Sequence, residues 1–419
     1  MASERVSARM SGGAPPIGPS NADPTSPSAN RLQANIPKLH LIQACRWFLL
    51  LMPVLVLFYQ ENGLSLQDVF IIQAFYSVCV ILCEIPSGYM ADRIGRKQSL
   101  LIGSVFAAAG FGVYAFSYTF SHFLTSQVLI AIGASFISGS DSALLYDTLL
   151  QLKRQGEYQK VAGRLASISN FSEGIAGIIG GFLALISLRT PLQVQAVLVL
   201  AAIPLAASLV EPARQNRTSG ENSLKAILRI VRYALHGHSE VKWLILYSSL
   251  VGTSTFTIVW FVQPYFTAVD LPLAWFGVGW AALQFSVGLF AYNAYRIEAW
   301  LGRRTALISL ILLAAAAYLV LGFFQTLWAL PFLFVFYLAR GINGPVQNDY
   351  INRCVSSDMR ATVLSVKSLV GRLMFVLLGP LVGWLSDSYS LGLALGVCGL
   401  VFLVFGLVFL GFLHRNKVL

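Results

Sequence analysis

Charged side chains are scarce in this chain of 419 residues, and their scarcity excludes an ordinary soluble domain. Only 11% of the residues are charged, whereas 56% are hydrophobic and the mean hydropathy is +0.70. A single soluble core cannot cover so much apolar surface. The sequence therefore predicts that most of the chain lies in a lipid bilayer.

Histidine and cysteine are also few, which argues against metal binding and enzymatic chemistry. The five histidines are scattered, and the five cysteines lie in or beside apolar runs without forming a cluster with histidine. The sequence contains no nucleophile elbow, phosphate-binding loop or zinc-ligand spacing. We therefore expect no catalysis, cofactor, metal or disulfide bond. A cleavable signal peptide is not expected either, because the first apolar run is long and begins only near residue 38.

Twelve apolar runs are present, and each is close to the ~20 residues that cross a hydrocarbon layer of ~30 Å. They cover residues 38–58, 67–90, 98–118, 121–149, 159–186, 192–211, 241–266, 273–296, 304–323, 327–352, 361–386 and 391–413. The sequence therefore predicts an all-α integral membrane protein with twelve transmembrane helices.

Positive charge is distributed unevenly between the two sides of these spans. If both termini are cytoplasmic, 24 of the 29 Lys and Arg residues lie on the cytoplasmic side and one, Arg189, lies on the other. The remaining four, Arg46, Arg340, Lys367 and Arg372, fall inside the spans. This split satisfies the positive-inside rule. The net charge of +11 is therefore explained by topology, and we expect no binding of nucleic acid.

Polar stretches divide the chain into five predicted segments. These are a disordered cytoplasmic tail (1–36), a first six-helix bundle (37–211), a cytoplasmic linker (212–240), a second six-helix bundle (241–414) and a short cytoplasmic tail (415–419). The first tail is rich in Ser, Pro and Gly and has no apolar run. Within the linker, residues 223–235 have the pattern of an amphipathic helix that lies on the membrane surface.

The turn between the second and third runs has a spacing that is hard to reach by chance. It reads Gly-Tyr-Met-Ala-Asp-Arg-Ile-Gly-Arg-Lys over residues 88–97. It resembles the Gly-x-x-x-Asp-Arg-x-Gly-Arg-Lys loop of the major facilitator superfamily at all six fixed positions, Gly88, Asp92, Arg93, Gly95, Arg96 and Lys97. The resemblance covers about residues 38–413 and implies a transporter of two six-helix bundles. It also implies a gating loop in which Asp92 clamps the cytoplasmic gate through the eleventh helix; the alternative is a plain basic turn.

Two weaker patterns bear on internal symmetry and on the direction of transport. The turn between the eighth and ninth runs keeps Gly302-Arg303-Arg304, as a degraded internal repeat would. The fifth run is similar to the Gly-x8-Gly-x3-Gly-Pro-x2-Gly-Gly motif of drug and metabolite antiporters at three of six positions, but Ala176-Gly177 replaces Gly-Pro. Small residues equally suit plain helix packing. An antiporter motif and a packing face both remain open.

Ionisable residues inside the spans are the main functional candidates, because a buried charge is costly unless it is paired, hydrated or used. Glu173, Arg340 and Arg372 are predicted to lie nearest the midplane. Either Glu173 or Asp141 pairs with one of these arginines across a cavity, or a bound anion compensates them. Glu173, followed by Asp141, is the candidate for proton coupling.

Further side chains complete the predicted site. Arg46 and Glu84 lie on neighbouring helices at similar depth and are predicted to form a structural ion pair. The predicted substrate-binding residues are Arg340, Arg372, Asn170, Asn343, Gln347, Gln263, Gln284 and Trp260. For each amide the alternative is a hydrogen bond between helices, and for the tryptophan it is packing or an interfacial belt.

These features favour a secondary transporter in the inner (cytoplasmic) membrane that acts as a monomer on a small molecule and protons. The favoured activity is proton-coupled export, by alternating access, of a small organic molecule such as an anionic metabolite, a carboxylate siderophore or a drug. A proton symporter that imports a polar nutrient is the first alternative. A non-transporting membrane receptor or lipid-handling protein is the alternative from another class.

Overall fold

The computed structural model describes residues 27–213, 232, 236–356 and 359–416. Every regular element in these residues is a helix. Eleven segments are long and apolar enough to cross a membrane, and they coincide with eleven of the twelve predicted spans. The fifth predicted span is α8 (Tyr158–Ala184), whose 27 residues are long enough to cross but include Lys160, Arg164 and Glu173. The predicted all-helical membrane fold is confirmed.

Several spans consist of more than one helix. The first six spans contain α2 (Asn35–Trp47), η1 (Met52–Val54), α3 (Leu55–Glu61), α4 (Leu66–Ile94), α5 (Arg96–Ala115), α6 (Phe120–Ile137), α7 (Ser140–Gln151), α8, α9 (Thr190–Val199) and α10 (Ala202–Ala207), with η2 (Gln155–Glu157) before α8. The last six contain α12 (Ser239–Ala268), η4 (Leu273–Trp275), α13 (Phe276–Leu301), α14 (Arg303–Phe323), η5 (Leu327–Phe332), α15 (Leu333–Cys354), α16 (Arg360–Ser388) and α17 (Leu391–Arg415).

The predicted disordered tail at residues 1–36 is too long at its end. A short helix, α1 (Pro27–Gln33), and the start of α2 lie within it. Asn35 explains this order, because its Nδ2 donates to Val210 O (2.8 Å) and its Oδ1 accepts from Val210 N–H (2.9 Å). Such long-range bonds leave no trace in local composition. The predicted amphipathic helix at 223–235 lies, apart from residue 232, outside the described residues.

Three spans, the first, the fourth and the sixth, are broken near their middle, and none of these breaks was predicted. The break in the sixth span is the mildest, because Leu200 and Ala201 between α9 and α10 keep helical backbone angles. In the first span, residues 48–51 separate α2 from η1, and Leu50 N–H donates to Gln195 Oε1 (2.8 Å). In the fourth span, Gly139 at φ +77° separates α6 from α7, a backbone angle that glycine adopts without strain. Irregular backbone at membrane depth requires polar partners inside the protein. Gln195 supplies one of them.

Glycine turns connect successive spans on the side where the basic loops lie. Gly95 (φ +111°) joins α4 directly to α5, and Gly302 (φ +75°) joins α13 to α14. The two turns predicted to be copies of an internal repeat therefore share a glycine with positive φ that joins two helices. At the first turn, Glu211 accepts hydrogen bonds from the N–H groups of Arg96 (2.8 Å) and Lys97 (2.7 Å). We call this end of the spans the basic side and the other end the opposite side.

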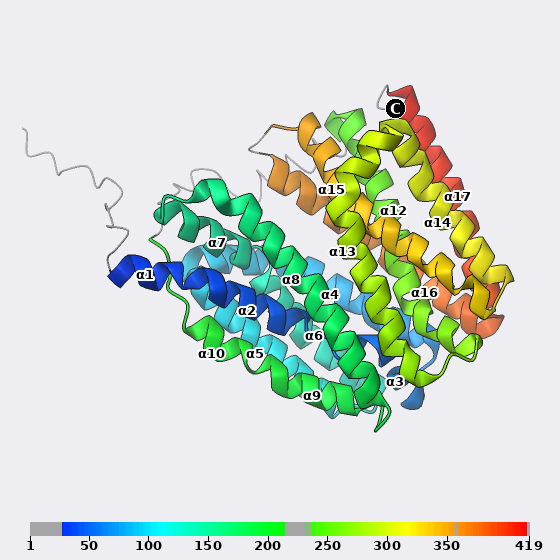
Figure 1. Cartoon of the computed structure of the whole chain (residues 1–419), viewed down its shortest axis with the longest axis horizontal. Helices are drawn as coiled ribbons and strands as arrows, with labels where there is room; N and C mark the ends of the chain where they lie inside the picture. Colours follow the sequence, from blue (N-terminus) through cyan, green and yellow to red (C-terminus); the bar gives the residue numbers. More distant parts are fainter. Residues whose placement is uncertain (1–26, 214–231, 233–235, 357–358, 417–419) are drawn as a thin grey trace, which may run out of the picture.

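The two bundles meet on the opposite side. α8 packs against α13 and α4 packs against α16. In Figure 1, α8 and α13 converge toward the end near α3 and diverge toward α7 and α15. The described structure is therefore a pair of bundles that is closed at one end and spread apart at the other.

Side-chain hydrogen bonds hold the closed end together. Gln263 of α12 accepts from Val56 N–H (2.7 Å) and donates to Met52 O (2.8 Å). The carboxylate of Asp387, at the end of α16, accepts from the N–H groups of the first two residues of α4 (3.1 and 2.6 Å). These four hydrogen bonds join the bundles at this end. The carboxylate also suits the positive end of the α4 dipole.

The predicted lone cation of the opposite side, Arg189, ties its loops together. Its guanidinium donates to Ala115 O (3.0 Å), Ser117 O (2.8 Å) and Asn62 Oδ1 (2.7 Å), and it stacks 3.8 Å from the ring of Tyr118. These contacts join the segments that follow the first, third and fifth spans. The one basic residue on this side thus has a structural task.

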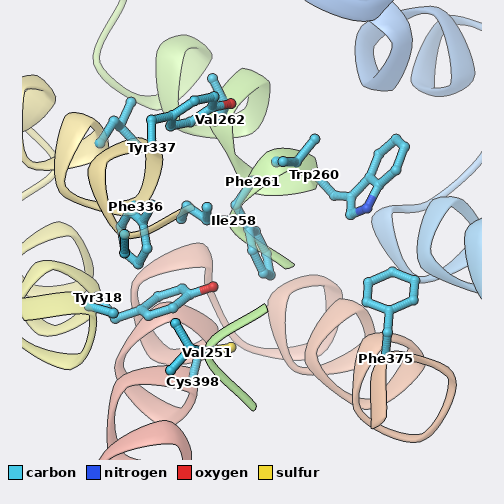
Figure 2. Packing of buried hydrophobic residues seen from close by; sticks show 14 of the residues in the cluster. Val251, Ile258, Trp260, Phe261, Val262, Tyr318, Phe336, Tyr337, Phe375 and Cys398 are labelled. Carbon is cyan, nitrogen blue, oxygen red and sulfur yellow. The ribbon is translucent and has the colours of Figure 1, made fainter. Parts of the chain in front are cut away.

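The second bundle is organised around α12, its most buried span. Figure 2 shows Ile258 and Phe261 of α12 among side chains from the neighbouring helices. Tyr318 of α14 donates to Ser254 O of α12 (2.7 Å) and packs its ring 4.5 Å from that of Phe336. This packing fixes the rotation of α12, so that Gln263 can reach the first bundle.

We expect Asp387→Asn to loosen the closed end, because the amide loses the charge that the α4 N-terminus stabilises. A helix-terminal charge contributes ~0.3–1 kcal/mol, which corresponds to a two- to five-fold shift between closed and open forms. The rate at which an impermeant maleimide labels a cysteine placed at the buried Leu66 position measures the shift. Asp68→Asn is the matched control, because Asp68 bonds only to Ser65 of its own turn. Equal labelling rates in both variants would show that Asp387 does not stabilise the closed end.

Candidate functional site

A glycine face on α8 brings the two bundles into contact. Gly177 lies against Trp280, and Gly181 lies against the backbone of Gly277, so close that a Cβ on either of these two glycines would lie within 3 Å of its neighbour. Phe285 of α13 covers Gly174 in the same way. The small residues of the fifth span thus form a packing face. Their presence does not decide between import and export.

Glu173 lies within this contact. It is only 6% exposed, and Gln284 and Trp280 of α13 are the polar side chains beside its carboxyl group. Trp280 Nε1 makes no hydrogen bond to any described residue. Arg340 of α15 interacts with the carboxylate electrostatically, without a direct hydrogen bond. The structure therefore brings together Glu173, Gln284 and Arg340, three residues that the sequence predicted for the site.

The two arginines of the second bundle differ in their surroundings. Arg340 is half-buried, and its guanidinium carbon lies 5.8 Å from the ring centre of Tyr337. Arg372 on α16 is also half-buried, and its Nε is sealed from solvent without a hydrogen-bond partner among the described residues. Neither arginine forms an ion pair within 4 Å in the described part of the chain.

The predicted ion pair between Arg46 and Glu84 is wrong. Arg46 Nη1 instead contacts Asp141 Oδ2 at 3.3 Å. The break at Gly139 explains the difference, because it places Asp141 in the first turn of the new helix α7, facing the last turn of α2. Asp141 is therefore not paired with Arg340 or Arg372. The pair lines a pocket of about 200 Å³ between α2, α7 and α8.

The amide side chains predicted to bind substrate differ in their hydrogen bonding. Gln263 uses both ends of its amide in the contact between bundles, so it is not free for a substrate in this conformation. Asn170 donates to Ala166 O of its own helix (3.1 Å), and Asn343 Nδ2 donates to Ser248 O (3.2 Å). Gln347 is 0% exposed, and neither end of its amide has a partner among the described residues.

Trp260 lies in the aromatic packing of α12. Its ring meets Phe256 edge-on at 5.9 Å, and Phe256 meets Phe375 at 4.7 Å. In Figure 2 the indole points from α12 toward the helices of the first bundle. Its Nε1 is buried and has no described partner. Packing covers most of the Trp260 side chain, and its indole N–H remains available to donate a hydrogen bond to a substrate.

The motif loop is exposed in this conformation. Asp92 is 68% exposed and pairs with Arg96 at 2.7 Å, one turn further along the chain. A Cβ on Gly88 would meet no atom within 4 Å. No described contact joins Asp92 to α16. The bundles are spread apart on the basic side of the described structure. The role of Asp92 as a clamp therefore remains a prediction for a conformation in which the basic side is closed.

Sequence reasoning missed three polar residues that the fold uses. Asp387 and Gln195 serve backbone groups of distant segments, and nothing in their local sequence indicates this. Tyr76 of α4 lies within electrostatic range of both Arg46 and Arg372. A tyrosine in an apolar run is usually interpreted as a packing residue. The neighbours of Tyr76 become visible only when the relative register of the helices is known.

The fold and these ionisable side chains define a multi-pass helical membrane protein made of two bundles, with an acid, Glu173, buried where they meet. The family model described as Major Facilitator Superfamily matches residues 40–378. The chain belongs to this family, which confirms the resemblance carried by the loop at residues 88–97. The family and its solved relatives are transporters, which agrees with the expectation that the chain is not an enzyme.

Curated relatives and solved structures agree with this family. The chain is 24% identical over 176 residues to the quinolone resistance protein NorA of Staphylococcus aureus, a match over 42% of this chain and 44% of the relative. It is 26% identical over 206 residues to the methyl viologen resistance protein SmvA of Salmonella typhimurium, over 45% and 40% respectively. These matches span less than half the length of the curated relatives.

Two solved structures share the whole fold. The nucleoside transporter NupG superposes with a TM-score of 0.73 at 14% identity, over 92% of this chain and 99% of that one. A bacterial homologue of the human lysosomal transporter Spinster, described as inward-facing and unoccupied, has a TM-score of 0.72 at 16% identity, over 91% and 96%. These similarities show the fold.

Proposed function

We propose that the protein is a secondary active transporter that exports a small organic molecule in exchange for protons by alternating access. The candidates are an anionic metabolite, a carboxylate siderophore or a drug. We propose that the protein acts as a monomer in the inner membrane. Both termini then lie in the cytoplasm, because the positive-inside rule assigns the basic side to the cytoplasm. The described conformation is then open to the cytoplasm, as an exporter is when it takes up its substrate.

Glu173 carries the proposal. It is a buried acid of the first bundle that faces Gln284 and Trp280 of the second, with Arg340 nearby. Gain or loss of a proton on Glu173 changes the net charge at the contact between bundles. A carrier driven by protons needs such a link between protonation and bundle contact, and an intramembrane acid is the usual means.

Other features support parts of the proposal. The names of two relatives, which refer to resistance to quinolones and to methyl viologen, favour an organic compound and outward movement. Asp141 is the second candidate for coupling, since its pair with Arg46 borders the pocket between α2, α7 and α8. Gly88 leaves room for a helix to approach the motif loop, so we propose that the Asp92 clamp forms when the cytoplasmic side closes.

Gradient-driven flux in proteoliposomes tests the proposal. With an acidic interior, an antiporter accumulates a quinolone carboxylic acid inside the vesicle, and a protonophore abolishes the accumulation. Protein-free liposomes correct for passive entry of the weak acid. Accumulation on the alkaline side, above that control, would indicate the importing symporter instead. Flux that equals the control for every gradient would refute transport of this compound class and favour a receptor or lipid-handling role.

A further inference from the structure

Of the three arginines inside the spans, one has no acid nearby. Arg46 contacts Asp141 at 3.3 Å, and Arg340 interacts with the carboxylate of Glu173. Arg372 has neither an ion pair nor a hydrogen bond from its side chain in the part of the chain that the structure describes, and its Nε is buried. An arginine stays charged when buried, so Arg372 leaves one positive charge uncompensated.

The register between α4 and α16 places Tyr76 beside this arginine. The two helices pack antiparallel, with Gln67 against Gly383 and Phe70 against Gly379. Continuing six residues along α4 brings Tyr76 level with the turn of α16 that contains Arg372. Tyr76 also lies within long-range electrostatic distance of Arg372, which agrees with this register.

These two side chains offer hydrogen-bond donors from both bundles. The Tyr76 hydroxyl has no hydrogen-bond partner among the described residues, and it can donate one proton. The Arg372 guanidinium presents a planar fork of N–H groups that matches two carboxylate oxygens. Arg46 adds long-range attraction on the side of Tyr76, although its ion pair with Asp141 weakens this attraction. The set of donors fits a single carboxylate group.

A second cation on α16 extends this positive character toward the basic side. Lys367 lies five residues before Arg372, and its Nζ donates to Asn348 Oδ1 at 2.7 Å. This partner is a neutral amide, so it leaves the ammonium charge uncompensated. Five residues turn through about 140° on an α-helix, so Lys367 lies on a different face of α16 from Arg372 and adds only long-range attraction for an anion.

We propose that Arg372 and Tyr76 form an anion-recognition subsite between the bundles that binds the carboxylate of the substrate. The inference rests on the proposed transport function and narrows its substrates to compounds with a carboxylate. The anion would bridge α16 and α4, and it would supply the charge that Arg372 lacks. Glu173 and Arg340 would remain a separate group that is used for protons.

Equilibrium binding to the purified full-length protein tests the subsite independently of any gradient. The probes are a quinolone carboxylic acid without a basic amine, its decarboxylated analogue and the dication methyl viologen. We expect the wild type to prefer the acid. Arg372→Gln should weaken binding of the acid about 10- to 100-fold, because a hydrogen bond to a charged group is lost. Tyr76→Phe should weaken it about three- to ten-fold.

Controls separate recognition from general damage. Arg372→Lys keeps the charge and should recover part of the affinity, while binding of the decarboxylated analogue should be unchanged in all variants. Equal affinity of the wild type for the acid and its analogue, or preference for methyl viologen, would overturn the proposal. An equal loss for acid and analogue in Arg372→Gln would also overturn it. Carboxylate-selective binding without flux would instead refute transport and leave the subsite standing.

Discussion

Glu173→Gln is expected to abolish the dependence of transport on the pH gradient while leaving exchange of substrate across the membrane intact. The amide keeps the shape of the side chain and can still bond to Gln284, but it cannot change its charge. The bundles would then move without carrying a proton. Gradient-driven accumulation in proteoliposomes should fall to the level reached with a protonophore, whereas exchange at equal pH should persist.

Glu84→Gln provides the matched control for this experiment. Glu84 is a half-buried acid in α4 with no described ion pair, and it lies away from the contact between α8 and α13. The same chemical change at Glu84 should leave gradient-driven accumulation at the wild-type level. Undiminished accumulation in Glu173→Gln would remove Glu173 from the coupling role, and attention would then move to Asp141.

Gly277→Val is expected to reduce transport about five-fold or more. Its Cβ would lie within 3 Å of the backbone of both Gly177 and Gly181, and overpacking of this kind costs ~1–3 kcal/mol. We expect this contact to separate when the opposite side opens, so the cost should fall on the closed conformation alone. The equilibrium should shift by ~5- to 150-fold toward the form that is open on the opposite side.

The same helix offers a control for this substitution. A Cβ on Gly288 would meet no atom within 4 Å, so Gly288→Val changes α13 without touching the first bundle. We expect it to retain nearly wild-type flux, and Gly277→Ala to fall between the two valine variants. Equal flux in Gly277→Val and Gly288→Val would show that the close approach of α8 and α13 is not needed for the cycle.

Hydropathy and charge predicted the spans well, because both are averages over many residues. The loop at residues 88–97 predicted the family, since six fixed positions occur together there. Local composition failed where one side chain acts at long range: Asn35 orders a segment predicted to be a tail by bonding to Val210. The break at Gly139 has no proline to mark it, whereas Pro53 follows the break at 48–51 by two residues and is a signal that the sequence reasoning overlooked.

The sequence predicted how deep in the membrane the site residues lie, but it did not predict which way their side chains face. Counting from helix ends placed Arg46, Glu84 and Asp141 at similar depth, and it could not tell which of the acids faces the arginine. The break before α7 decides this by turning Asp141 toward α2. Likewise, Gln263 lies at the level of a plausible cavity, yet its amide closes the contact between bundles. Helix rotation, rather than helix position, is what the sequence leaves open.

The central claim is that the bundles alternate between the described form, closed on the opposite side, and a form closed on the basic side. Distances between pairs of spin labels on a cysteine-free background test it most directly. Gln155 with Arg304 reports on the basic side, and Ser187 with Thr326 reports on the opposite side; all four residues are exposed. At rest, the first pair should be far apart and the second close. Gly277→Val should shorten the first distance and lengthen the second, and unchanged distances in both pairs would contradict the account.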